Sequence, residues 1–149
     1  MTRVAVALGS NLGDRRSHLD YAVTRLGEVL SALAVSSFVE TDPEGLLPQP
    51  RYLNGAVVGE TELTPRILLD KLLAIERERG RERPFPGAAR TLDLDLILYG
   101  SEIVKTSGLV VPHPRFRERR FVLEPLAAIA PDLVDPVTGL TVSALLSRL

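Results

Sequence analysis

The chain has 149 residues, which is long enough to bury a substantial hydrophobic core and too short for two independent domains. Hydrophobic residues make up 45% of it and charged residues 25%, a composition that excludes disordered and fibrous proteins. Its 18 basic residues nearly balance its 19 acidic ones, so no global field draws the protein to nucleic acid or to an anionic membrane. We therefore expect one domain over residues 1–149 that binds neither.

The lack of cysteine restricts the chemistry further. It excludes disulfides, thiolate zinc sites and a cysteine nucleophile, and two histidines cannot build a histidine-rich metal cluster. A bound metal is therefore expected to be a hard ion with oxygen ligands. The N-terminal sequence enters an apolar strand without a basic segment before a long apolar stretch, which predicts a cytoplasmic protein.

Hydrophobic periodicity predicts a strand, a helix and a second strand in the first third of the chain. Residues 3–8 alternate and are rich in Val and Ala, and the Gly-Ser-Asn sequence at 9–11 interrupts this strand. Residues 34–41 form the second strand, and the loop at 42–50 contains three prolines and a glycine, which exclude regular structure. The helix between the strands is predicted from apolar residues at helical spacing, which are Leu19, Ala22, Val23, Leu26 and Leu30.

The middle of the chain repeats this order of strand and helix. Residues 52–61 form a β-branched, alternating strand, and Thr64-Pro65 begins a helix that we expect to end near Gly80. A basic loop broken by Pro and Gly follows at 81–89, and residues 92–99 alternate strictly as a strand. The stripe that turns the helix toward the core consists of Ile67, Leu68, Leu72 and Ile75.

The last third of the chain carries shorter elements. A strand at 102–105 is expected to pair with the strand before it, and helices are expected at 121–129 and 142–149. The order β-α-β-β-α-β with a helical tail is the split pattern of a ferredoxin-like αβ sandwich. The sequence therefore predicts an α+β fold, in which an antiparallel sheet carries helices on one face and the chain ends in a helical tail.

Two aspartates in the strand at 92–99 form the first candidate site. Every even position from 92 to 98 is leucine, so one face of the strand packs on the core while Asp93, Asp95 and Ile97 share the other. The backbones of the aspartates lie about 6.6 Å apart, and two such carboxylates repel each other unless positive charge lies between them.

Oxygen ligands without a neighbouring histidine suit Mg²⁺, which takes its remaining ligands from water and substrate phosphates. Two such ions could clamp a phosphoryl group during in-line transfer. For a bare Asp-x-Asp sequence, the solvated face of an amphipathic strand is the more common explanation, so the surrounding residues decide between the two.

Basic residues bracket the aspartates in sequence. Arginine binds phosphate bidentately and stays charged, so arginines on the loop at 81–89 could close over a triphosphate as a lid. The alternative is ordinary pairing with glutamates of the same helix end, which we expect for Arg77 and Arg79. The residues that bracket the strand are Arg81, Arg83 and Arg90 before it and Arg115, Arg117, Arg119 and Arg120 after it.

The two histidines have different surroundings. His113 lies between Pro112 and Pro114 and could donate a hydrogen bond to a phosphate, although a lone histidine is more often a structural residue. His18 lies on the first helix, where we expect it at the surface.

These segments together resemble the 6-hydroxymethyl-7,8-dihydropterin pyrophosphokinase family of folate biosynthesis, in the family's order and over most of the chain. The two most specific stretches are Arg-Thr-Leu-Asp-Leu-Asp at 90–95 and Val-Pro-His-Pro-Arg at 111–115. The other matching stretches are residues 8–14, 49–54, 75–76, 80–81 and 121–126.

The resemblance implies an Mg-dependent diphosphotransferase that uses two Mg²⁺ ions and ATP as co-substrate. It implies pyrophosphoryl transfer to 6-hydroxymethyl-7,8-dihydropterin, giving AMP and 6-hydroxymethyl-7,8-dihydropterin diphosphate. Asp93 and Asp95 would hold the metal ions, and the catalytic residues would be Asp95, Arg81 and Arg90, with Asp95 orienting the attacking hydroxyl. The residues implied in ATP binding are Glu76, Arg81, Arg83, Arg90, Leu96 through its backbone, His113 and Arg119.

The same resemblance implies a pterin site between the Pro-rich loop and the tail. Its residues would be Thr41 through its backbone, Asn54 on the amide edge of the pterin, and Tyr52 and Phe121 as aromatic surface; ordinary core packing is the alternative for the two aromatics. The chain departs from the family pattern at 86–89, which reads Pro-Gly-Ala-Ala, and at Glu44, where an apolar residue is common. We expect a monomer with small-molecule partners only.

Two other functions remain compatible with the residues alone. A ferredoxin-like module could bind a ligand or RNA without catalysis, although RNA recognition on a sheet needs exposed stacking aromatics and only 5% of the residues are aromatic. Nucleotidyl transfer could use the same metal pair, and it would release pyrophosphate and an adenylylated acceptor. Product analysis distinguishes nucleotidyl transfer from pyrophosphoryl transfer, which releases AMP.

Overall fold

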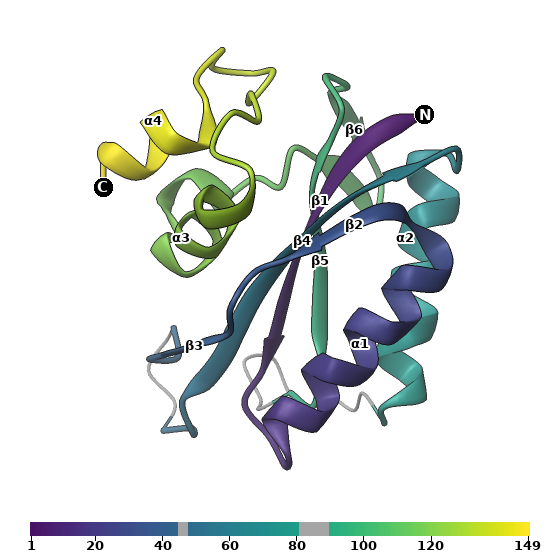
Figure 1. The fold of residues 1–149 in the computed structure, drawn as a ribbon, viewed down its shortest axis with the longest axis vertical. Helices are drawn as coiled ribbons and strands as arrows, with labels where there is room; N and C mark the ends of the chain where they lie inside the picture. Colours follow the sequence, from purple (N-terminus) through teal and green to yellow (C-terminus); the bar gives the residue numbers. More distant parts are fainter. Residues whose placement is uncertain (45–47, 81–89) are drawn as a thin grey trace.

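The structure is a computed structural model that describes residues 1–44, 48–80 and 90–149. Figure 1 shows a twisted sheet with helices on both sides. The elements in chain order are β1 (Thr2–Ser10), α1 (Arg15–Val29), β2 (Ser31–Val35), β3 (Val39–Thr41), β4 (Tyr52–Thr61), α2 (Pro65–Glu78), β5 (Asp93–Tyr99), β6 (Val104–Thr106), β7 (Leu109–Val111), η1 (Phe116–Glu118), α3 (Arg120–Ile129) and α4 (Val142–Ser147).

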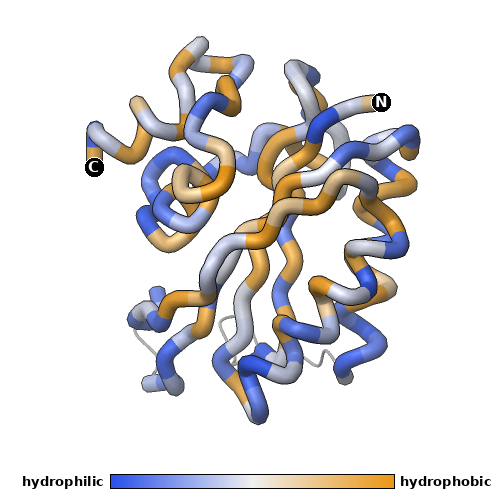
Figure 2. Tube along the Cα trace, in the orientation of Figure 1, coloured by the Kyte–Doolittle hydropathy of each residue, from blue (hydrophilic) through white to orange (hydrophobic). Residues whose placement is uncertain are grey.

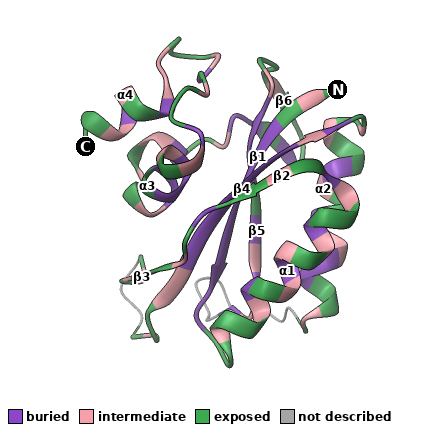
Figure 3. Ribbon diagram, viewed as in Figure 1, coloured by how far each residue is buried: buried purple, intermediate pink, exposed green. Residues whose placement is uncertain are grey.

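The main sheet is antiparallel, with the strand order β2-β4-β1-β5 and with β3 paired to the other end of β4. The central strands β1 and β4 are buried along most of their length because both faces of the sheet are covered there (Figure 3). β6 and β7 form a separate hairpin. This architecture confirms the predicted ferredoxin-like α+β fold.

Each face of the sheet carries its own hydrophobic core. α1 and α2 pack on one face, and their buried side chains are mostly leucine, among them Leu19, Leu26, Leu68 and Leu72. The helical tail packs on the other face through α3 and α4, around the fully buried Phe116. The sequence predicted the helices and the tail but not that the tail covers the second face. Apolar residues accordingly concentrate in the strands and on the inner sides of the helices (Figure 2).

Side-chain caps explain where three of the helices begin. Asp14 accepts a hydrogen bond from the backbone N–H of Ser17 at 3.1 Å, and Thr64 and Thr141 cap α2 and α4 in the same way. Pro65 occupies the first turn of α2, where its missing N–H costs nothing. The predicted start of α2 at Thr64-Pro65 is therefore confirmed.

Four local predictions differ from the structure. β1 continues through residues 9–10, because β4 pairs with both of them and β5 pairs with residue 9. The strand expected at 34–41 is divided into β2 and β3, and the strand near 102–105 pairs with β7 instead of β5. Ile67 was assigned to the core stripe but has an exposed fraction of 46%, whereas the other three members of the stripe are buried.

The leucine alternation of β5 holds over its first half and then changes face. Leu94 and Leu96 pack on the core below α1 and α2, as predicted, but Leu98 joins Ile97 in the opposite core. The cause is an irregularity in the pairing with β1, where the register shifts between residues 5 and 6. Asp93 and Asp95 lie before this shift, so their common face is as predicted.

Polar contacts join α1 and α2 at their exposed sides, and they differ from the expected pairing. Arg79 donates hydrogen bonds to Nδ1 of His18 at 3.0 Å and to Ser17, so His18 is a partly buried partner and not a free surface residue. Glu78 pairs with Arg25 of α1 instead of with an arginine of its own helix. The hydrogen bonds from Arg25 and the Tyr21 hydroxyl lower the pKa of Glu78 to about 2.

Asp135 anchors the turn between α3 and α4. It is fully buried and accepts two hydrogen bonds from Arg117, at 2.5 and 3.0 Å, and one from the Thr138 hydroxyl. Burial alone raises the pKa of Asp135, but the ion pair with Arg117 and the hydrogen bonds from Thr138 and Val137 outweigh it and hold the pKa below its ordinary value.

Replacing Asp135 by alanine is expected to lower the free energy of unfolding by roughly 3 kcal/mol at pH 7, because Arg117 loses its buried partner. A carboxyl whose pKa is depressed in the folded state stabilises above its unfolded pKa of about 4, and this contribution is lost as the pH falls through the folded pKa. Urea unfolding of both proteins at pH 7 and pH 3 measures the difference. A difference of the same size at both pH values would contradict this assignment.

None of the described helices combines the length and apolar character that crossing a membrane requires.

Candidate active site

A cavity of about 450 Å³ lies on the face of the sheet that carries α3, near the end of the sheet where β1 ends and β4 and β5 begin. α3 covers the other end of this face (Figure 1). The cavity brings together ten of the residues that the sequence assigned to a site. They are Thr41, Tyr52, Asn54, Glu76, Arg90, Asp93, Asp95, His113, Arg119 and Phe121.

The floor of the cavity follows from the strand register. Gly9 of β1 lies opposite Asp93 on one side and opposite Asn54 on the other, and Ala7 lies opposite Asp95. Because side chains directly across an antiparallel pair share a face, these residues form rows across the sheet. Two strand spacings of about 4.8 Å place the backbones of Asp93 and Asn54 about 10 Å apart.

Gly9 keeps the space between Asp93 and Asn54 open. A Cβ atom at Gly9 would lie 2.9 Å from Oδ1 of Asn54 and would contact Cδ1 of Tyr52 at 3.4 Å, so even an alanine there would displace the Asn54 amide. The sequence-based prediction assigned Gly9 only to a turn. The signal that could have identified it is a glycine inside an apolar strand, which marks a close approach of a backbone or ligand.

The start of β5 is fixed by two charged residues that are themselves buried. Arg90, with an exposed fraction of 6%, forms an ion pair with Asp93, which supplies positive charge beside the aspartate pair. Glu76 of α2 is buried, and its Oε2 accepts a hydrogen bond from the backbone N–H of Leu94 at 2.7 Å. The two aspartates therefore project from a firmly held segment, with Asp95 exposed to the cavity.

His113 lies at the cavity as a neutral hydrogen-bond donor. Its backbone N–H donates to the carbonyl of Ile97 at 3.0 Å, and its Nδ1 accepts from the backbone N–H of Arg115 at 3.2 Å. Burial lowers the pKa of His113, and Arg119 and Arg115 lower it further against the opposing charge of Asp95. With Nδ1 as acceptor, Nε2 carries the proton and can donate to an anion.

Two arginines give the cavity the capacity to bind an anion. The Nε atoms of Arg90 and Arg119 are buried and, within the part of the chain that the structure describes, have no hydrogen-bond partner. Arg119 also lies over the ring of Phe121, at 5.5 Å from its centroid, and 3.1 Å from Oε1 of Glu44. Buried guanidinium N–H groups require acceptors, and phosphate oxygens supply them in the geometry that arginine prefers.

The part of the cavity lined by Asn54, Tyr52 and Phe121 combines an amide with aromatic side chains, as a site for a flat heterocycle does. Asn54 is buried and donates a hydrogen bond to the Thr41 hydroxyl, so its amide is held in place. Tyr52 and Phe121 are partly exposed and line the cavity, and Phe121 also packs against the core on this face of the sheet. A fixed amide can bind the polar edge of a heterocycle, and aromatic side chains of the same cavity can contact its faces.

Three predicted residues are not placed in the cavity. Arg81 and Arg83, together with the rest of the expected lid and the departure at 86–89, lie outside the described residues. Leu96 is buried in the core below the sheet and does not line the cavity, although its predicted contact was through the backbone.

Several lining residues were not predicted. The cavity reaches past the edge strand β5 to Leu69 and Leu73 of α2, and it also includes Gln49. The two leucines lie four residues apart beside the core stripe of α2, so they extend its apolar face by a second row. The signal that could have identified Leu69 and Leu73 is an apolar stripe on α2 wider than the helix needs to pack on the sheet.

The donor set fits Mg²⁺. Among residues 1–44, 48–80 and 90–149, no three histidine or carboxylate side chains gather where they could hold a metal ion together. Asp93 and Asp95 supply carboxylate oxygens alone, and Mg²⁺ commonly takes one or two protein carboxylates and completes its shell with water and substrate phosphates. Because Arg90 occupies one oxygen of Asp93, metal binding there would share this carboxylate with the arginine.

Comparisons with known proteins agree with this geometry. Residues 5–131 match the model of a family described as 7,8-dihydro-6-hydroxymethylpterin-pyrophosphokinase (HPPK). The chain is 46% identical over 137 residues to a 2-amino-4-hydroxy-6-hydroxymethyldihydropteridine pyrophosphokinase from Pseudomonas aeruginosa, and the match covers 90% of the chain and 84% of the relative.

Two longer proteins match over part of their length. The chain is 37% identical to the folic acid synthesis protein fol1 from Pneumocystis carinii, in a match that covers 98% of the chain and 20% of that protein. The fold also resembles a crystal structure of wild-type HPPK-DHPS from Plasmodium falciparum, with a TM-score of 0.74 at 14% identity, covering 99% of the chain and 44% of that structure. The chain thus spans less than half of these two proteins.

Proposed function

The chain belongs to the 7,8-dihydro-6-hydroxymethylpterin-pyrophosphokinase family and is a pyrophosphokinase of folate biosynthesis, and on that premise we propose which of its residues carry out the transfer. The observation that carries the proposal is the row Asp93–Gly9–Asn54, which sets a carboxylate pair and a buried amide side by side in one cavity. A phosphate-transfer centre and a pterin site within about 10 Å can hold the two reacting groups in contact.

We assign the metal positions to Asp93 and Asp95, as a pair that would hold two Mg²⁺ ions together with ATP phosphates. Bound there, Mg²⁺ would neutralise phosphate charge and align the phosphates for in-line transfer. The ion pair with Arg90 holds the Asp93 carboxylate in place. Asp95, exposed to the cavity, is free to orient the hydroxyl of the acceptor as well.

Arg90, Arg119 and His113 then contact the triphosphate. A contact within the protein holds each of these side chains in place. Arg90 pairs with Asp93, Arg119 lies over the ring of Phe121, and His113 accepts a hydrogen bond from the backbone of Arg115. Preorganised donors stabilise the charge that develops on the transferred group without reorganising during the reaction. Leu69 and Leu73, on the apolar side of the cavity, suit the adenine ring.

The pterin is placed against Asn54, between Tyr52 and Phe121, with its hydroxymethyl group toward Asp95. The hydroxymethyl group gives its proton to Asp95, and its oxygen attacks the β-phosphorus. A new oxygen–phosphorus bond forms, the bond between the β-phosphorus and the oxygen bridging to the α-phosphate breaks, and AMP leaves. Positioning of the two substrates supplies most of the catalysis in such a transfer.

Product analysis tests this assignment. Protein, Mg²⁺, the pterin alcohol and ATP labelled at the β-phosphorus are expected to give unlabelled AMP and a labelled pterin diphosphate. Release of labelled pyrophosphate with an adenylylated acceptor would identify nucleotidyl transfer instead. The cytoplasmic location, the monomeric state and the single domain over residues 1–149 remain predictions from the sequence.

A further inference from the structure

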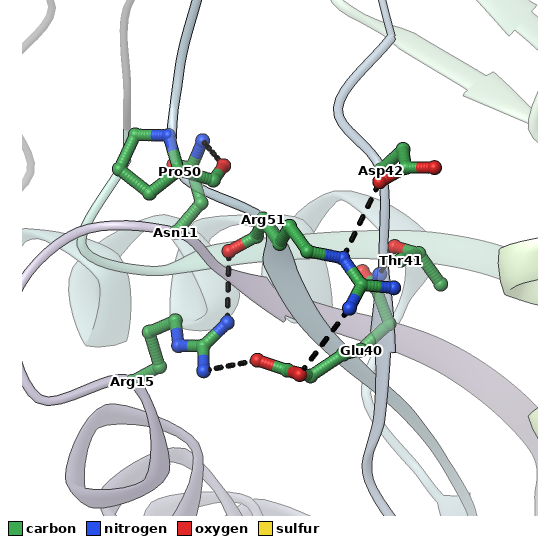
Figure 4. Close-up of polar contacts among 8 residues, drawn as sticks. Asn11, Arg15, Glu40, Thr41, Asp42, Pro50 and Arg51 are labelled. Atoms are coloured by element: carbon green, nitrogen blue, oxygen red, sulfur yellow. Dashed lines mark hydrogen bonds and ion pairs between the residues drawn. The ribbon is translucent and has the colours of Figure 1, made fainter.

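Asn11 is a fully buried polar residue just after β1, and the sequence-based prediction assigned it no role. Its exposed fraction is 0%, and within the described residues its hydrogen bonds join it to Arg90, Gln49 and Pro50, which are far away in sequence. Its backbone N–H donates to the carbonyl of Arg90 at 3.0 Å, and its Oδ1 accepts from the backbone N–H of Arg90 at 2.7 Å. Its Nδ2 donates to Oε1 of Gln49 at 2.8 Å and to the carbonyl of Pro50 at 3.2 Å (Figure 4 shows the contact with Pro50).

Two of these partners determine how the amide is oriented. The backbone N–H of Arg90 can only donate and the carbonyl of Pro50 can only accept, so Oδ1 must face Arg90 and Nδ2 must face Pro50. No other side chain of this size has an acceptor on one branch and a donor on the other. Aspartate would keep the first bond and lose the second, and alanine would lose both.

The partners of Asn11 belong to the two sides of the cavity. Gln49 lines it on the side of Tyr52 and Asn54, in the segment that leads into β4. Arg90 lines it on the other side and holds Asp93 at the start of β5. The single side chain of Asn11 therefore connects the segment beside the pterin site with the segment beside the phosphate site.

We propose that Asn11 is a positioning residue that couples pterin binding to nucleotide binding, an inference that rests on the proposed function. A nucleotide that engages Arg90 holds its backbone, and through the Asn11 amide it also holds Pro50 and Gln49 in the position that the pterin needs. Pterin binding then costs less free energy, because the segment that contacts the pterin is already ordered. By reciprocity, bound pterin raises the affinity for the nucleotide by the same factor.

A second set of contacts provides a control, because it holds the pterin-side segment without reaching Arg90. Arg15 of α1 donates to the carbonyl of Arg51 at 2.9 Å and pairs with Glu40, and Arg51 pairs with Glu40 and Asp42 (Figure 4). Loss of Glu40 loosens this segment from α1 but leaves the bridge through Asn11 intact.

The coupling is measured by calorimetry, as the ratio of the pterin Kd without and with a non-hydrolysable ATP analogue and Mg²⁺. In the unchanged protein we expect the analogue to lower the pterin Kd by a factor of about 10 or more. In Asn11→Ala we expect the analogue to change the pterin Kd by less than about twofold. Asn11→Asp, which keeps the acceptor for Arg90, is expected to lose the coupling while its affinity for the ATP analogue changes less than about twofold.

Two controls separate coupling from general destabilisation. Ser36→Ala removes another buried hydrogen bond, from the backbone N–H of Ala56 at 2.8 Å, and Glu40→Ala loosens the same segment; both are expected to keep the ratio. An unchanged ratio in the folded Asn11 variants, a ratio of one in the unchanged protein, or an equal loss in the controls would overturn the inference while leaving the proposed function standing. Failure of the unchanged protein to bind either ligand would overturn both.

Discussion

Asp95→Ala is expected to reduce turnover by about 10³-fold while the protein stays folded. Asp95 shares its face with Asp93, away from the leucine core of β5, so removing its carboxylate leaves no cavity in the packing. The variant loses one of the two carboxylates assigned to Mg²⁺ and the group assigned to orient the pterin hydroxyl. AMP release at saturating Mg²⁺, ATP and pterin measures the effect, and thermal unfolding verifies the fold.

The matched control for this prediction is Asp20→Ala. Asp20 is an exposed aspartate of α1 that pairs with Arg16 at a distance of 3.7 Å and does not line the cavity. We expect its loss to leave AMP release unchanged, since exposed ion pairs contribute little to stability. AMP release by Asp95→Ala at the rate of the Asp20 variant would show that the carboxylate pair is a solvated strand face.

Arg90→Lys is expected to lower kcat by about 10²-fold while the KM for ATP rises less. Lysine keeps the positive charge, but its three N–H groups lie on one nitrogen, so it cannot reproduce the planar, bidentate geometry in which a guanidinium binds a carboxylate or a phosphate. The backbone contacts of Arg90 with Asn11 do not depend on the side chain, so the variant should keep its fold. Initial rates over a range of ATP concentrations separate kcat from KM.

Arg16→Lys is the control for this change, because Arg16 is an exposed arginine whose side chain lies outside the cavity. It is expected to behave as the unchanged protein does. If Arg90→Lys retained full kcat, positive charge alone would suffice at this position, and the need for a guanidinium between Asp93 and the triphosphate would be disproved.

The face on which the aspartates lie could be predicted from the sequence because it depends only on alternation within one strand. Leucine at positions 92, 94 and 96 determines that face without knowledge of any neighbour. The change of face at Leu98 could not be predicted, because it results from an irregularity in the pairing with β1. Local periodicity carries no information about the register of a partner strand.

The cavity itself depends on contacts that are distant in sequence. The row Asp93–Gly9–Asn54 exists only when three strands are in register, and the hydrogen bond between Arg90 and Asn11 joins residues 79 positions apart. The family resemblance assigned most of the lining residues individually. It did not show that Gly9 and Asn11 connect them, because these two act through their neighbours.

The packing of the tail was also beyond local pattern. The helices at 121–129 and 142–149 were predicted in nearly their observed places, but periodicity does not tell which face of a sheet a helix covers. The small residues of the sheet explain the outcome, because Ala5, Ala7 and Ala56 leave room on this face for α3. The part that α3 leaves open is the cavity.

Calorimetric titration of a non-hydrolysable ATP analogue, with and without Mg²⁺, tests most directly whether Asp93 and Asp95 form the nucleotide–metal site. In the unchanged protein, Mg²⁺ is expected to tighten binding of the analogue at least about tenfold. In a variant with both Asp93→Asn and Asp95→Asn, we expect this dependence on Mg²⁺ to disappear while the fold persists. Equal dependence on Mg²⁺ in the two proteins would contradict the assignment.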